Sequence, residues 1–319
     1  MEYRDLGTTG IQVSEVGFGA WAIGGDAWGE VDDRNSVAAI RQALELGVTF
    51  IDTADVYGDG RSEQLVAEAI HGRRQEVVLS TKGGLMGHHR DPARDPVYHR
   101  PEKVLDALDA SLRRLRTDHL DVYWCHIWWD KPEETEAFLV AFDRMKRDGK
   151  VRAVGVSTDD IAHLKHYGRE GGIDAVQVDY SILNRAPEVD VLPYAGSHGL
   201  GVVVRGPLGK GLLTGKFSAQ STFTAGDIRA SWPDDPAFRY NLEKVDALRA
   251  LAEGDGTLGQ LAVRFVLANP AVSVAIPGAK TPAQAVENAL ASRRPLLSDK
   301  VRSRIDAVAP SPAAGSEVH

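Results

Sequence analysis

Several polar residues stand at the ends of short apolar segments, in a set that suits chemistry on a carbonyl group. Asp52 falls near the end of TFIDTA, Lys82 closes VVLSTK and His126 closes LDVYWCH, while Tyr57 follows shortly after Asp52. Hydride addition to a carbonyl builds negative charge on its oxygen. Such a site therefore needs a proton donor together with a nearby cation or hydrogen-bond donor.

Each of these four residues has a role in such a reaction. Tyr57 can donate the proton. A phenol has an ordinary pKa of about 10, and a neighbouring Lys82 ammonium is expected to lower that pKa toward working pH. Asp52 would keep Lys82 charged, and His126 would orient or polarise the carbonyl oxygen. Structural roles stay open, namely an ion pair for Asp52 and Lys82, an exposed loop position for Tyr57 and a core position for His126.

An alternation of strands and helices would bring these residues together. Strands are predicted at 16–21, 49–54, 77–82, 120–126, 151–157, 175–180, 201–205 and 273–278. Segments with helical periodicity, such as 35–47, 101–115 and 132–150, lie between them. Eight nearly all-apolar strands alternating with helices predict a (β/α)₈ TIM barrel, whose functional residues gather at the carboxyl ends of the strands.

Three further segments complete the predicted domain. The residues around Gly7-Thr8-Thr9-Gly10 predict an N-terminal β-hairpin that plugs the bottom of the barrel. Segments 83–100 and 206–239 are predicted to be long loops that cover the site at the C-terminal face. We expect a single barrel domain over 1–310 and a disordered tail over 311–319, because that tail is small and polar.

The composition excludes several classes of protein. A formal charge of −8 opposes binding to nucleic acid. Because the chain shows neither a signal-peptide pattern at its start nor an apolar run of roughly 18 residues, we expect a cytoplasmic protein without a membrane partner. The single cysteine, Cys125, excludes an internal disulfide and is expected to be a packed thiol. The sequence does not indicate an oligomeric state.

Two familiar kinds of site are missing from the sequence. It contains no HxH or HExxH spacing, and His88-His89 are adjacent in a segment rich in Arg and Asp, so we expect no metal site. No GxGxxG follows a strand either, which disfavours a Rossmann domain. A nucleotide cofactor would therefore have to be held by the loops of the barrel.

Four motifs in matching order carry a family resemblance. FIDTADVYGDGRSE, LSTKGG, YWCHIWWD and IPGAKTPAQAVEN together resemble the aldo-keto reductase superfamily, over residues 3 to about 295. The resemblance implies an NADP(H)-dependent oxidoreductase that reduces small aldehydes or ketones to alcohols, with Asp52, Tyr57, Lys82 and His126 as its catalytic residues. The alternatives are oxidation of a sugar or polyol by the same site, and a nucleotide-sensing binding subunit.

Cofactor contacts are expected in two loops and at three strand ends. The turn over 206–211 can wrap a pyrophosphate with its backbone amides, or it is an ordinary turn. Lys280 and Thr281 precede a predicted helix whose N-terminus favours anions, where the resemblance implies the adenosine 2′-phosphate. The expected contacts are Ser157, Thr158, Gln177, Arg205, Gly206, Pro207, Leu208, Gly209, Gly211, Gly278, Lys280, Thr281, Gln284, Glu287 and Asn288.

The sequence departs from the family pattern at several of these positions. Many members have Ser-Asn where Ser157-Thr158 stands, and an aromatic residue in place of Arg205. The Arg205 guanidinium is expected either to cover the nicotinamide or to reach the pyrophosphate. Some members carry a basic residue where Gly278 and Gln284 stand, so Lys280 is the main support for NADP over NAD.

Four tryptophans fall on loops at the predicted catalytic end, namely Trp21, Trp28, Trp128 and Trp129. Together they predict an apolar or ring-shaped substrate pocket, with stacking available for a sugar or an aromatic carbonyl compound. Burial in the core is the alternative for each of them.

Overall fold

Eight parallel strands close into the predicted barrel. The structure is a computed structural model that describes residues 1–84, 98, 100–126, 132–253, 256–295 and 297–312. Its strands follow each other around the sheet in chain order and are β3 (Phe18–Gly19), β4 (Phe50–Asp52), β5 (Val78–Gly83), β6 (Leu120–Cys125), β7 (Val151–Ser157), β8 (Ala175–Asp179), β9 (Gly201–Arg205) and β10 (Val274–Ala275). The Gly17 and Gly19 amides donate to the carbonyl oxygens of Ala275 and Pro277 at 2.8 and 3.1 Å, which joins the first strand to the last.

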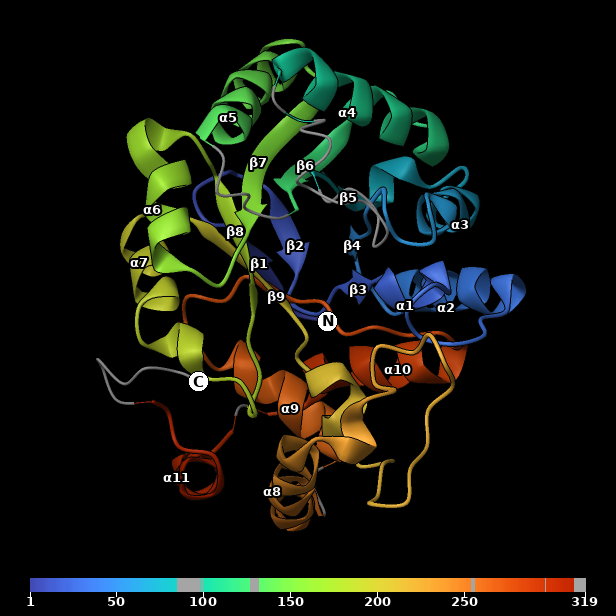
Figure 1. Ribbon diagram of the computed structural model, residues 1–319, viewed down its shortest axis with the longest axis vertical. Helices are drawn as coiled ribbons and strands as arrows, with labels where there is room; N and C mark the ends of the chain where they lie inside the picture. Colours follow the sequence, from blue (N-terminus) through green and yellow to red (C-terminus); the bar gives the residue numbers. More distant parts are fainter. Residues whose placement is uncertain (85–97, 99, 127–131, 254–255, 296, 313–319) are drawn as a thin grey trace.

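Helices surround the strands (Figure 1). Helix α4 is typical: Pro101 occupies its first turn, and Val104, Leu108, Leu112 and Leu115 recur at helical spacing on its buried face. The described helices are α1 (Trp21–Gly24), α2 (Asp33–Glu45), α3 (Arg61–Ala69), α4 (Pro101–Leu115), α5 (Pro132–Arg147), α6 (Ile161–Gly168), α7 (Val191–Ser197), α8 (Pro236–Ala252), α9 (Leu258–Leu267), α10 (Pro282–Leu290) and α11 (Asp299–Val308). Among these described helices, none is long and apolar enough to cross a membrane.

The N-terminal hairpin covers the bottom of the barrel, as the sequence predicts. Its antiparallel strands are β1 (Tyr3–Asp5) and β2 (Gln12–Ser14). Leu6, Ile11 and Val13 pack into the barrel interior with side chains from the strands, Trp124 among them. Gly7 has a φ of +54°, and a Cβ there would lie 2.3 Å from the Gly201 amide nitrogen, so the contact between hairpin and barrel requires glycine.

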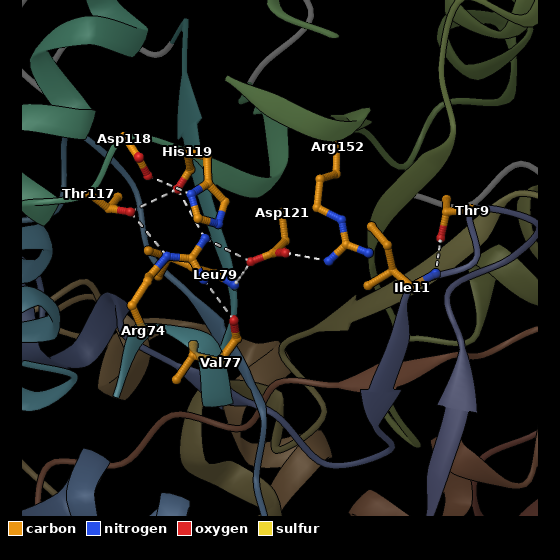
Figure 2. A network of polar contacts seen from close by, with 10 residues as sticks. All are labelled: Thr9, Ile11, Arg74, Val77, Leu79, Thr117, Asp118, His119, Asp121 and Arg152. Atoms are coloured by element: carbon orange, nitrogen blue, oxygen red, sulfur yellow. Dashed lines mark hydrogen bonds and ion pairs between the residues drawn. The ribbon is translucent and has the colours of Figure 1, made fainter. Parts of the chain in front are cut away.

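A buried carboxylate joins three strands near the same end of the barrel. Asp121 of β6 accepts from the Arg74 guanidinium at 2.9 Å, from the Leu79 amide at 2.8 Å and from Arg152 at 2.7 Å (Figure 2). Its side chain is 4% exposed, so both carboxylate oxygens need these partners. This network fixes β5, β6 and β7 at the end of the barrel away from Asp52 and Lys82.

The two predicted long loops differ in what the structure describes. Segment 83–100 lies mostly outside the described residues. The other loop ends earlier than predicted, because Asp235 caps α8 and Pro236 starts it. Within this loop, between β9 and α8, the chain returns toward the segment after α1, where the Ile228 amide donates to the Ala27 carbonyl at 3.0 Å. Segments far apart in the sequence therefore meet at the C-terminal face.

Candidate active site

The structure brings the predicted Asp52, Tyr57 and Lys82 into direct contact. Asp52 ends β4, Lys82 lies in β5, and Tyr57 lies in the turn that follows β4. The Lys82 ammonium donates to the Asp52 carboxylate, to the Thr53 carbonyl at 3.0 Å and to the Tyr57 hydroxyl at 3.2 Å. Lys82 has no exposed surface, so all three bonds form away from solvent. The three side chains can therefore transfer a proton and stabilise the charge left behind.

A buried chain of hydrogen bonds positions Asp52. The Trp124 indole donates to the Ser80 hydroxyl at 2.6 Å, and Ser80 donates to Asp52 at 2.6 Å. The Gln177 side-chain amide donates to the same carboxylate oxygen at 3.0 Å. Ser80 and Trp124 were not among the residues predicted from the sequence. Their inward position follows from strand alternation, because Ser80 and Lys82 share one face of β5.

Burial changes the acidities of this site in a way the sequence did not predict. Burial disfavours the charged form of Lys82 and is the largest single effect, but Asp52 and Tyr57 together outweigh it and raise the pKa of the ammonium. Burial also raises the pKa of Tyr57, and Lys82 offsets only part of this increase. The expected lowering of the Tyr57 pKa toward working pH is therefore wrong. Tyr57 is a protonated phenol at neutral pH, which is the form that donates a proton.

Aromatic rings extend from Tyr57 in two directions. The His126 ring meets the Tyr57 ring edge-on at 5.6 Å, and Trp21 stacks against the other side at 5.9 Å. Trp28 contacts Trp21 edge-on at 5.0 Å. Two of the four predicted tryptophans thus join the tyrosine and histidine, whereas Trp128 and Trp129 lie outside the described residues. The indole nitrogens of Trp21 and Trp28 are buried and have no acceptor among the described residues.

A second acidic group, Asp55, lies in the turn that carries Tyr57. Burial raises the pKa of Asp55 to about 7; Glu63 adds to the rise, whereas Arg114 and Lys82 oppose it. A Cβ on Gly83 would lie 3.7 Å from the Asp55 carboxylate and 2.2 Å from the Tyr123 hydroxyl, so both groups border the same glycine. Sequence reasoning missed Asp55, since nothing in its local pattern indicates burial.

This carboxyl predicts a pH-dependent stability. Its folded-state pKa of about 7 exceeds the unfolded value of about 3.9, so the folded state binds the proton more tightly and loses stability as pH rises between these values. Between pH 5 and pH 8 the release of this proton should cost wild type about 2–3 kcal/mol of its free energy of unfolding, and Asp55→Asn should not show that loss. Urea unfolding at both pH values measures the difference. Parallel stability changes in the two proteins would show that Asp55 does not titrate this way.

The predicted nicotinamide contacts line the ends of neighbouring strands. Ser157 ends β7, Gln177 lies in β8 and Arg205 ends β9. The Gln177 side-chain amide donates to the Asp52 carboxylate, as described above. Thr158 is buried, and its hydroxyl accepts from the Asp160 amide at 3.1 Å in a local turn. These residues lie on neighbouring strand ends, and Gln177 is hydrogen-bonded to the Asp52 carboxylate.

The glycine-rich turn after β9 contains three glycines in the left-handed region of backbone conformation. Gly206, Gly209 and Gly211 have φ values of +66°, +55° and +95°. A Cβ on Gly211 would lie 3.6 Å from the Arg229 guanidinium and 3.8 Å from the Lys216 side chain. Two cations therefore border this turn. The remaining predicted residues, Pro207 and Leu208, lie in the same turn, and Leu208 packs against the core.

The predicted residues before and within α10 form its N-terminal cap. Thr281 accepts from the Gln284 amide at 3.3 Å, and the Gln284 side chain accepts from the Lys280 amide at 2.8 Å. Asn288 donates to the Gly278 carbonyl at 3.2 Å, whereas the Glu287 carboxylate accepts from Thr257 at 2.8 Å. The Lys280 ammonium reaches the Trp28 carbonyl at 2.5 Å. Lys280 therefore extends toward the loop that carries Trp28.

Lys280 and two cations of the 206–239 loop, Lys216 and Arg229, lie near one another, and Arg229 and Lys280 also contact Trp28. The Arg229 guanidinium lies 5.0 Å from the Trp28 ring and pairs with Asp227 at 2.6 Å. Burial lowers the pKa of both Lys216 and Lys280, and Arg229 lowers each further. Lys216, Arg229 and Lys280 carry three positive charges against one Asp227 carboxylate, which suits phosphate. Sequence reasoning missed Lys216 and Arg229, because the 206–239 loop has no periodicity that predicts its path.

Comparisons with known proteins identify the family. The model of the aldo/keto reductase family matches residues 15–310. Aldo-keto reductase YhdN of Bacillus subtilis is 36% identical over 291 residues, covering 89% of this chain and 86% of that protein. The chain belongs to the aldo/keto reductase family, as the motifs predicted.

Solved structures agree with this assignment. Glycerol dehydrogenase from Gluconobacter oxydans is 31% identical, with a TM-score of 0.81 over 99% of both chains. An aldo/keto reductase from Klebsiella pneumoniae in complex with NADP and acetate is 27% identical, with a TM-score of 0.77 over 100% of this chain and 99% of that chain. The barrel of this chain is thus that of oxidoreductases.

Proposed function

We propose that the protein is an NADPH-dependent reductase that converts aldehydes or ketones to alcohols, with Tyr57 as its proton donor. The observation that carries this proposal is the buried Lys82 ammonium, which contacts both the Asp52 carboxylate and the Tyr57 hydroxyl. A metal-free carbonyl reduction needs an acid whose conjugate base is stabilised where it forms, and this pair supplies both.

The reaction divides between the bound nucleotide and the side chains. NADPH supplies the hydride that adds to the carbonyl carbon. Tyr57 donates its proton to the carbonyl oxygen, so the product is a neutral alcohol. Lys82 stabilises the resulting phenolate by charge and by the hydrogen bond at 3.2 Å. His126, edge-on to Tyr57, is placed to hold the substrate oxygen, and solvent returns the proton to Tyr57 afterwards.

The three-cation group supports NADP as the cofactor. Lys216 and Arg229 border the glycine-rich turn, where a pyrophosphate would lie, and Lys280 stands at the N-terminus of α10, where a 2′-phosphate gains from the helix dipole. Like charges within this group repel one another, since its three cations outnumber the Asp227 carboxylate. Phosphate binding relieves that repulsion, which is why the residues fit a phosphorylated dinucleotide.

Lys280→Ala should reduce the preference for NADPH over NADH. A charge-assisted hydrogen bond contributes about 1.5–3 kcal/mol, so NADPH should bind wild type roughly 10- to 150-fold more tightly. The preference should lie toward the lower part of this range, because Gly278 and Gln284 supply no charge, and it should weaken with salt. Fluorescence titration of both nucleotides measures it. An unchanged affinity ratio in the variant would remove Lys280 from the 2′-phosphate site.

The tryptophans proposed to contact substrate combine aromatic rings with hydrogen-bond donors that have no acceptor among the described residues. Trp21 and Trp28 offer ring faces near Tyr57, and their buried indole N–H groups have no acceptor among the described residues. A carbonyl compound that carries a ring or several hydroxyl groups would fill both needs. This supports aromatic aldehydes and sugars as the first substrates to examine, with Trp128 and Trp129 as further proposed contacts.

A direct test measures NADPH and NADH oxidation with aldehydes, quinones, steroids and sugars. Turnover of at least one class, lost in Tyr57→Phe, is expected. Tight NADPH binding without turnover of any compound would instead favour a nucleotide-sensing subunit. Oxidation of polyols by the same residues is the second candidate, supported by the likeness to glycerol dehydrogenase. The same panel, run with NADP⁺ and alcohols, measures that direction.

A further inference from the structure

Arg205 is held by two carboxylates at the ends of neighbouring strands. Its guanidinium donates to Asp179 at 3.2 Å and to Asp159 at 2.5 Å. Asp159 also accepts from the Asp179 amide at 2.7 Å, so the acidic pair is itself fixed to the end of β8. Arg205 lies directly opposite Asp179 in the register of β8 and β9. These three residues are called the Arg205 cluster below.

The Arg205 cluster lies at the same face of the barrel as the reacting groups. Arg205 is the last residue of β9, at the same barrel face as Asp52 and Lys82, and its charge favours the ionised form of the Tyr57 phenol. Gly206 follows it, and a Cβ there would lie 2.7 Å from the Asp179 carboxylate. A nicotinamide ring that delivers hydride to a carbonyl at Tyr57 must lie within this part of the barrel mouth.

The charge of that ring changes during the reaction. The dihydronicotinamide of NADPH is neutral, and loss of hydride leaves a ring with one positive charge. A fixed charge beside the ring therefore acts differently on the two forms of the nucleotide. A carboxylate favours NADP⁺, whereas a guanidinium favours NADPH.

We propose that the Arg205 cluster borders the nicotinamide ring and sets the relative affinity for NADP⁺ and NADPH, an inference that rests on the proposed function. Arg205 favours the neutral dihydronicotinamide of NADPH, whereas the Asp159 and Asp179 carboxylates favour the cationic ring of NADP⁺. The ion pairs within the Arg205 cluster thus balance the two affinities, and a change in any one charge should shift their ratio.

Asp179 is influenced by charges both inside and outside the Arg205 cluster. Burial raises the pKa of Asp179, while Arg205 opposes the rise and Asp159 adds to it. Lys210 is exposed and also favours the ionised form of Asp179. Arg205→Gln and Asp159→Asn each change one charge and leave Lys210 and Asp179 unsubstituted, and the side-chain oxygen of the introduced asparagine can still accept from the Asp179 amide.

Binding measurements on two variants test the proposal. Dissociation constants for NADP⁺ and NADPH are measured by protein fluorescence for wild type, Arg205→Gln and Asp159→Asn. Arg205→Gln removes a positive charge and should lower the ratio of the NADP⁺ to the NADPH constant by about 3- to 10-fold. Asp159→Asn removes a negative charge, and the ratio should rise by about the same factor. A tenfold change corresponds to about 30 mV in the potential of the bound couple.

A residue near the phosphates, which NADP⁺ and NADPH share, provides the control. Arg229→Gln should weaken both nucleotides by the same factor, because their phosphates are identical, and so leave the ratio unchanged. Arg205→Lys keeps the charge and should restore most of the wild-type ratio. If the ratio of the NADP⁺ to the NADPH dissociation constant is unchanged, or moves the same way in Arg205→Gln and Asp159→Asn, the inference about the Arg205 cluster is overturned. The proposed function is unaffected by that result. Failure of wild type to bind either nucleotide overturns the proposed function, and the inference with it.

Discussion

Tyr57→Phe is expected to lower the rate of carbonyl reduction by about 10²–10⁴-fold, the usual contribution of a general acid. The substitution removes only the hydroxyl, so the ring can keep its contacts with Trp21 and His126. Affinity for NADPH should change little, because the three cations that fit the phosphates lie on other segments. Steady-state kinetics and fluorescence titration measure the two effects separately.

The stability of this variant is a useful control. Tyr57 is 8% exposed and its hydroxyl receives one of the three Lys82 hydrogen bonds, so its loss leaves Lys82 two other acceptors. A folded variant by circular dichroism, with near-wild-type NADPH affinity and much reduced turnover, is the expected combination. Near-wild-type turnover would assign the proton donor to another group.

Lys82→Met should have an effect of similar size for a different reason. Lys82 favours the ionised form of Tyr57, so its removal raises the pKa of the phenol further and makes it a weaker acid. Turnover should fall by at least about 10²-fold. The high-pH limb of the rate profile, where Tyr57 ionises, should move to higher pH in the variant. The comparison requires that chemistry limits the rate, which a kinetic isotope effect with deuterated NADPH establishes.

The fold of Lys82→Met needs its own measurement, because the change leaves the Asp52 carboxylate buried without its cation. Ser80 and Gln177 still donate to Asp52, which supports a folded variant. Asp52→Asn weakens the support of the Lys82 charge but also removes a carboxylate that itself raises the pKa of Tyr57, so it should reduce turnover less. An unchanged pH profile in a folded Lys82→Met protein would separate Lys82 from the acidity of Tyr57.

Much of the barrel follows from local pattern. Apolar strands ending in Asp52, Lys82 or Arg205 predict both the parallel sheet and the face on which these residues gather. The acidity of Tyr57 does not follow in this way. The pKa of Tyr57 rises because the phenol is buried, with Trp21 and His126 from distant segments packed against its ring. This burial outweighs the effect of the nearby ammonium.

The cofactor side of the site was predicted less completely. Lys280 precedes a recognisable helix start, whereas Lys216 and Arg229 lie in a loop whose path depends on long-range contacts such as the bonds from Ile228 to Ala27 and from Arg249 to Gly215. The partners of Arg205 could not be read from the sequence either. Asp159 and Asp179 end up beside it because β7, β8 and β9 are neighbours in the barrel.

Isotope transfer tests hydride delivery with Tyr57 as the acid most directly. The enzyme is supplied with NADPH carrying deuterium at C4 of the dihydronicotinamide, on each face in turn, and with a carbonyl compound that it turns over. Mass spectrometry of the alcohol should find one deuterium on the former carbonyl carbon for one labelled face, with product formation suppressed in Tyr57→Phe. An alcohol without deuterium from either face, or equal product from Tyr57→Phe, would contradict the proposed reaction.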